Sequence, residues 1–137
     1  MFKKILFPVD LAHKDALERA LHVVGKLAQD CGARVVYMGA TSSVPGSIAH
    51  TPEEFGQKLE AFAAEQARQY GIEGEARTEV VGDPRVEADD TIVRAAAAAG
   101  ADLIVMQTHQ PGLMDYVWHS NGERVASHAP ISVFLVR

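Results

Sequence analysis

Polar side chains follow two of the apolar stretches in this chain, at the point where each stretch ends. Asp10 comes directly after the run 5–9, and a polar segment from Gln107 to His109 comes directly after the run 103–106. Continuous apolar runs are typical of parallel strands that are covered on both faces. Because the carboxyl ends of parallel strands meet at one edge of a sheet, we expect these polar residues to lie close together. This is the edge at which α/β proteins bind nucleotides and other anions.

A helix start is predicted beside the same edge. Ser120 and Glu123 have the spacing of a capping box, in which each side chain bonds a backbone N–H group at the start of the helix. The remaining N–H groups of a helix N-terminus attract anions. Ser120 and Asn121, with His119 before them, are therefore candidate contacts for a bound anion.

Each of these assignments has a structural alternative. Asp10 could equally cap the helix that follows it, and Ser120 could be an ordinary N-cap, which is compatible with contact to a ligand. His109 could be a loop residue satisfied by its own neighbours. Metal binding is a further alternative for one set of side chains: Asp10, His13, His109 and His119. Histidines in loops are more often simple surface residues, so we predict no metal site.

Strand-like and helix-like segments alternate along the whole chain. Apolar runs predict strands over residues 5–9, 34–38, 77–81, 103–106 and 132–136. The intervening segments carry apolar residues at helical spacing, and Gly32, Gly71 and Gly100 can end the first three helices. The alternation predicts right-handed βαβ units. The predicted fold is therefore one α/β domain over residues 1–137, a doubly wound, five-stranded parallel sheet with four helices.

Two helix starts carry specific signals. Thr51, Pro52 and Glu54 occupy the N-cap, N1 and N3 positions of the second helix. The third helix is predicted to begin at Asp83, with Pro84 at N1. The acidic residues that follow favour an N-terminal turn through the helix dipole, so we predict helical backbone across residues 86–90.

Composition and charge exclude several classes of protein. The chain has 137 residues, with 13 basic and 18 acidic side chains and a formal net charge of −5. This balance argues against a general nucleic-acid or anionic-membrane surface. No segment approaches the roughly 20 apolar residues of a membrane span, and the N-terminal apolar run is too short for a signal peptide. We therefore expect a cytoplasmic protein.

The signatures of several common α/β functions do not occur in the sequence. There is no GxxxxGK[ST] segment, no GxGxxG after the first strand, no GxSxG and no HExxH. No nucleophile is paired with a general base in a recognisable pattern. We expect a protein that is not primarily an enzyme, with slow ATP hydrolysis at most.

The motifs, taken in order, resemble those of the universal stress protein family over nearly the whole chain. The matching segments are Ile5–Asp10, Val81–Pro84, Gly100–Met106, Thr108–His109 and His128–Val133. The resemblance implies an α/β fold like that of adenine-nucleotide-binding proteins, with strand order 3-2-1-4-5. It also implies that two chains pair through the last strand. The segment from Asp83 to Ile92 is longer than the usual family spacing, by about one helical turn.

The resemblance implies where the base and the ribose of an adenine nucleotide would lie. Pro8 and Val9 would line the base pocket. Asp10 would contact the ribose or a water network beside it. The backbone at Gly39 and Ala40, after the second strand, would meet the edge of the adenine.

On the phosphate side the chain departs from ATP-binding members of the family. Their phosphate loop has a G-x-x-G … G-[ST] pattern, and its glycine positions hold Gln107, Gln110 and His119 here. Glycine allows backbone N–H groups to approach a phosphate closely, so we predict weak binding of ATP or AMP, with Mg²⁺ only alongside the nucleotide. The candidate phosphate contacts are Gln107, Thr108, His109, His119, Ser120 and Asn121.

Two functions remain open at this point. The first is a homodimeric, adenine-nucleotide-binding stress-regulatory module, and the second is a nucleotide-free dimeric interaction protein with the same fold. Both depend on the apolar last strand, which would otherwise be an exposed sheet edge. Two such edges can pair about a two-fold axis. The residues of this predicted interface are Ser132, Val133, Phe134, Leu135 and Val136.

Overall fold

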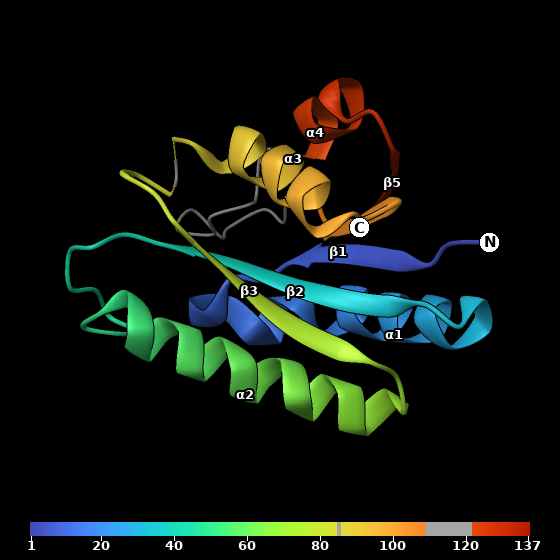
Figure 1. The fold of residues 1–137 in the computed structure, drawn as a ribbon, viewed down its shortest axis with the longest axis horizontal. Helices are drawn as coiled ribbons and strands as arrows, with labels where there is room; N and C mark the ends of the chain where they lie inside the picture. The colour runs from blue at the N-terminus through green and yellow to red at the C-terminus, as the bar shows by residue number, and fades with distance from the viewer. Residues whose placement is uncertain (85, 109–121) are drawn as a thin grey trace.

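A five-stranded sheet in the order β3-β2-β1-β4-β5 forms the centre of the structure (Figure 1). The computed structural model describes residues 1–84, 86–108 and 122–137. The strands are β1 Lys4–Pro8, β2 Arg34–Thr41, β3 Gly74–Val80, β4 Leu103–Gln107 and β5 Ser132–Val136. All four neighbouring pairs are parallel, which confirms the predicted fold class and strand order.

Helices cover both faces of the sheet (Figure 1). The helices α1 (Glu18–Cys31) and α2 (Pro52–Tyr70) lie on one face, and α3 (Ala88–Ala99) and α4 (Gly122–His128) lie on the other. The chain moves outward from β1 to β3 and then returns to β4, so right-handed crossovers place the two pairs of helices on opposite faces. The strand order therefore reverses between β1 and β4, where sheets of this kind bind ligands. None of the described helices has both the length and the apolar character of a membrane span.

The central strands are apolar on both faces because helices cover both. Ile5, Leu6 and Phe7 of β1 are fully buried, and every residue of β4 is buried. On the face covered by α2, Tyr37 packs edge-on between the rings of Phe7 and Phe62. This contact ties the middle of the sheet to α2.

The predicted helix ends are confirmed at three positions. Gly32, Gly71 and Gly100 follow α1, α2 and α3, each in the left-handed conformation that favours glycine. The predicted start of α2 is also confirmed, since the Thr51 side chain accepts a hydrogen bond from the Glu54 N–H group at 3.1 Å.

The prediction for the start of α3 is wrong. The helix begins at Ala88, and Pro84 lies in a turn before it. In this turn the Glu87 carboxylate accepts from the Asp83 N–H group at 2.9 Å, and the Asp83 carbonyl accepts from Glu87 N–H at 3.0 Å. Glu87 itself has φ −93° and ψ 9°, which is not helical. A local side-chain bond to the backbone has competed with helix formation, so residues 86–87 form a turn, whereas residues 88–90 are helical as predicted.

Other boundaries also differ from the predictions. Strand β2 continues past Met38 to Thr41, and β3 begins at Gly74, because β3 pairs along its whole length with residues 35–41 of β2. A 3₁₀ segment, Leu11–Leu17, precedes α1. The predicted start of the last helix at Ser120 lies outside the described residues, which include that helix from Gly122.

Candidate functional site

A cavity of about 530 Å³ lies at the carboxyl ends of β1 and β2. Its described walls come from the segment 9–13, from residues between 40 and 49, from Phe55 and from the pair 83–84. The volume lies within the range of about 300 to 1,000 Å³ that is usual for small-molecule sites. The strand ends and the loop after β2 therefore form a site of a size that suits a small ligand.

The cavity has both apolar and polar walls. Its apolar lining includes Val9, Leu11, Ala40, Ile48 and Phe55. Its polar lining includes Asp10, His13, Thr41, Ser42 and Ser47. An apolar pocket with a few polar groups can bury a flat ring and orient it through hydrogen bonds.

Asp10 is the most buried polar residue in the described lining of this cavity. Its side chain is 5% exposed, and its two carboxylate oxygens have different partners. Oδ1 accepts from the Ala12 N–H group at 3.0 Å, and Oδ2 is 3.0 Å from His13 Nδ1. Asp10 therefore caps the 3₁₀ segment and also lines the cavity, so its capping role is confirmed and its contact with a ribose stays a prediction.

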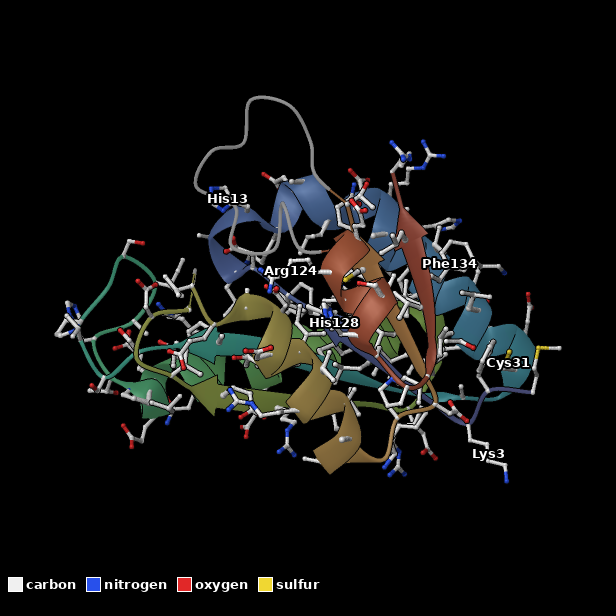
Figure 2. The ribbon with its side chains drawn as sticks, turned by 90° about the horizontal axis from the view of Figure 1, so that it is seen from above. Lys3, His13, Cys31, Arg124, His128 and Phe134 are labelled. Carbon is white, nitrogen blue, oxygen red and sulfur yellow. The ribbon has the colours of Figure 1, made fainter. Side chains whose placement is uncertain are left out.

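The local backbone brings His13 to Asp10. Past the end of β1, the Val9 N–H group donates to the Met38 carbonyl at 2.7 Å, and the chain then turns into the 3₁₀ segment. His13 interrupts this segment with φ −131° and ψ 44°. An ionised carboxylate can only accept hydrogen bonds, so Nδ1 of His13 carries the hydrogen. Figure 2 shows His13 well apart from Lys3 and Cys31, which lie toward the opposite end of the molecule.

The loop after β2 is tied to the start of α2. Lys58 donates to the Ile48 carbonyl, and the Glu54 carboxylate accepts from the His50 N–H group at 3.0 Å. The His50 hydrogen bond, with a smaller contribution from the Lys58 charge, lowers the pKa of Glu54. These contacts hold the loop that forms much of the cavity wall.

The structure brings together three of the residues predicted for the base and ribose. Val9, Asp10 and Ala40 line the cavity. Pro8 and Gly39 are buried and are not among its described lining residues. Gly39 lies within β2, where an added Cβ would be 2.8 Å from the Phe55 ring. Its lack of a side chain therefore makes room for Phe55, which lines the cavity.

Of the residues predicted to contact the phosphates, the two that the structure describes do not line the cavity. The Thr108 N–H and hydroxyl groups both donate to the Val136 carbonyl, at 2.8 and 3.1 Å. Gln107 is 1% exposed, and neither of its amide atoms has a hydrogen-bond partner in the described part of the chain. Neither residue is among the described cavity-lining residues. His109, His119, Ser120 and Asn121 lie outside the described residues.

Sequence reasoning missed the largest part of the cavity wall. The segment from Thr41 to Ala49 was predicted only as a loop, and His13 only as a possible metal ligand. The concentration of serine, glycine and proline after the second strand was an available signal, because ligand-binding residues often lie in loops at strand ends. Across residues 1–84, 86–108 and 122–137, no group of three or more side chains could hold a metal ion.

Comparison with known proteins identifies the family of this chain. The sequence model of the universal stress protein family matches residues 1–137. The chain belongs to the universal stress protein family. Universal stress protein G of Shigella flexneri is 26% identical to it over 148 residues, with 100% of both chains covered.

Solved structures of universal stress proteins have the same fold. The universal stress protein from Archaeoglobus fulgidus, in complex with dAMP, has a TM-score of 0.69 and 24% identity, covering 98% of each chain. A family member from Arabidopsis thaliana with AMP bound has a TM-score of 0.65 and 19% identity, covering 98% of this chain and 90% of its own. At these identities, the likeness establishes the universal stress protein fold of this chain.

Proposed function

We propose that this universal stress protein binds an adenine nucleotide weakly and acts as a homodimeric stress-regulatory module. The observation that carries the proposal is the cavity of about 530 Å³ at the ends of β1 and β2, with the carboxylate of Asp10 in its wall. Its apolar lining suits a purine ring, and its acceptors suit ribose hydroxyl groups. The complexes of two family members with dAMP and AMP support this choice of ligand class.

The phosphates are expected to contribute little affinity. Gln107, Gln110 and His119 occupy positions at which the ATP-binding pattern has glycine. Each side chain hinders the close approach of backbone N–H groups to a phosphate. Losing a few hydrogen bonds at about 1 kcal/mol each gives a dissociation constant near 100 μM for ATP or AMP. Mg²⁺ would bind only with the nucleotide, and hydrolysis would be slow at most.

The homodimer would form through β5. This strand is at the edge of the sheet, and Phe134 and Leu135 are 44% and 36% exposed. Exposed apolar edge strands are usually covered or paired. This observation equally supports the second candidate, a dimeric interaction protein that binds no nucleotide.

Isothermal titration calorimetry with AMP, ADP and ATP, with and without Mg²⁺, distinguishes the two candidates. We expect dissociation constants of about 100 μM, weakened about fivefold by Asp10→Ala through loss of one hydrogen bond. Asp30→Ala is the matched control, because Asp30 is exposed and precedes Cys31, which Figure 2 shows far from His13. Lys58 is unsuitable as a surface control, since it donates to the Ile48 carbonyl in the cavity wall.

Two results would count against nucleotide binding as proposed. No heat from any of the three nucleotides at millimolar concentration would favour the nucleotide-free interaction protein. Sub-micromolar affinity for ATP would show that the replaced glycines do not weaken the phosphate contacts.

A further inference from the structure

A second cavity, of about 520 Å³, forms a groove between the 3₁₀ segment and α2. Its described walls come from the 3₁₀ segment, from the loop after β2 and from one face of α2: Leu11, Lys14, Ile48, Lys58, Ala61, Phe62 and Glu65. The four residues of α2 have the i, i+3, i+4 and i+7 spacing of a single helix face. Leu11 and Ile48 also line the cavity at the ends of β1 and β2, so this α2 groove lies directly beside it.

The packing of α1 against α2 explains where the groove opens. At the end of α2, Gly25 of α1 makes room for the Tyr70 ring, from which an added Cβ would be only 2.5 Å away. The Gln29 amide also donates to the Tyr70 carbonyl there. The groove lies along an earlier part of α2, where its described opposite wall comes from the 3₁₀ segment and not from α1. The two helices are therefore in close contact beyond the groove, and the 3₁₀ segment leaves a space beside Phe62.

The charged groups of the groove differ in their existing partners. Lys58 donates to a loop carbonyl and lies 3.5 Å from the Glu54 carboxylate. Glu65 is paired with Arg68 through two hydrogen bonds. Lys14 is exposed and makes no hydrogen bond or ion pair with any residue in the described part of the chain. Its ammonium group is therefore the one best placed to meet an anion at this groove.

We propose that the α2 groove binds a free medium-chain carboxylic acid, with its alkyl chain against Leu11 and Phe62 and its carboxylate beside Lys14. Apolar walls favour burial of an alkyl chain, and a neighbouring ammonium group complements an anionic head. The volume lies within the range of about 300 to 1,000 Å³ for small-molecule sites. The seven described lining residues are far fewer than the roughly 20 to 30 on each side of a standard protein interface, which favours a small ligand. This binding would not require a nucleotide in the neighbouring cavity.

Calorimetry of the full chain with hexanoate, octanoate and decanoate tests the apolar part of the site. Each methylene group that the groove buries should raise the affinity about fourfold, so decanoate should bind about fifteenfold more tightly than octanoate. Ala61→Trp should prevent binding, because Ala61 is exposed on α2 and its replacement would fill the groove. Ala64→Trp is the matched control, since Ala64 is exposed on the same helix and is not among the described lining residues.

A charge reversal at Lys14 tests the polar part of the site. Lys14→Glu should weaken octanoate binding about tenfold, because an attraction becomes a repulsion, and should leave the affinity for octanol unchanged. The uncharged alcohol separates the effect of charge from that of packing. Lys26→Glu is the matched control, since it changes the net charge equally at an exposed position outside the described groove walls.

Several results would overturn the proposal. One is the absence of heat from decanoate at millimolar concentration, and another is an affinity that does not rise with chain length. Equal losses of octanoate and octanol binding in Lys14→Glu would exclude the charge pair. A change of oligomeric state in Ala61→Trp but not in Ala64→Trp, measured by light scattering, would assign the groove to a protein partner instead.

Discussion

Two side chains in the described core have buried polar atoms without a hydrogen-bond partner, Tyr37 and Gln107. Gln107 ends β4, at the point where the strand order reverses and ligands bind in sheets of this type. Tyr37 is in the middle of the sheet between Phe7 and Phe62. The structure shows no role for its hydroxyl group, and burial raises the pKa of Tyr37, so the group stays neutral at physiological pH.

Replacing Tyr37 by phenylalanine should therefore stabilise the protein. The ring contacts with Phe7 and Phe62 would remain, while an unsatisfied buried hydroxyl would be removed. We expect the free energy of unfolding in urea to rise by about 1 kcal/mol. Tyr70→Phe is the control, and its effect should stay within about 0.5 kcal/mol because that residue is only partly buried. A clear loss of stability in Tyr37→Phe would mean that the hydroxyl has a partner in solution.

Among the elements, the loop after β2 and the N-terminus of α2 act together at the cavity. The Glu54 side chain is in the first turn of α2 and accepts from His50 N–H at 3.0 Å, and it is 3.5 Å from the Lys58 ammonium group. The helix start therefore helps to fix the loop that lines the cavity. A change at Glu54 should alter both stability and ligand affinity.

Glu54→Ala should lower the melting temperature more at pH 7 than at pH 3. Folding lowers the pKa of Glu54, first through the His50 bond. The stabilisation is therefore complete above the unfolded pKa of about 4.3, and it is lost as the pH falls through the lower folded pKa. Thermal melts at the two pH values test this, with Glu53→Ala in the same helical turn as the control. An equal loss at both pH values would contradict the ionic origin of the effect.

On the scale of the whole molecule, the cavity and the proposed dimer surface are separate. The cavity borders β1 and β2, whereas β5 is on the far side of β4. Pairing of two β5 strands would extend the parallel sheet of each chain across a two-fold axis. We therefore expect dimerisation and nucleotide binding to be separable by mutation.

Phe134→Lys should convert the dimer to a monomer and leave AMP affinity unchanged. A lysine on an exposed edge strand places a charge in the apolar interface, and like charges from the two chains would meet there. Light scattering at micromolar concentration measures the change. Val80→Lys is the matched control, because Val80 is 56% exposed on β3 at the opposite edge of the sheet. A monomeric wild-type protein, or a dimer disrupted only by Val80→Lys, would contradict the assignment to β5.

Features that depend on residues close together in the sequence could be predicted from the sequence alone. The apolar runs predicted the five strands, and the glycines after α1, α2 and α3 predicted the helix ends, because a left-handed residue is a local requirement. The Thr51 cap is also local, since its partner is three residues away. With the strict alternation of strand and helix, these signals were enough to predict a parallel sheet with helices on both faces, whereas the strand order was implied by the resemblance to a known family.

The remaining features were decided by tertiary contacts. Strand β2 extends to Thr41 because β3 pairs with it. Gly39 leaves room for the Phe55 ring, and the residues next to Gly39 in the sequence do not indicate this contact. The cavity wall forms only when the loop after β2 is brought beside Asp10 and His13. Periodicity and capping report interactions within a few residues, whereas strand ends and cavities depend on segments far apart in the sequence. The sequence could therefore predict a candidate ligand site at this edge of the sheet, and only the folded chain determined which side chains line the cavity found there.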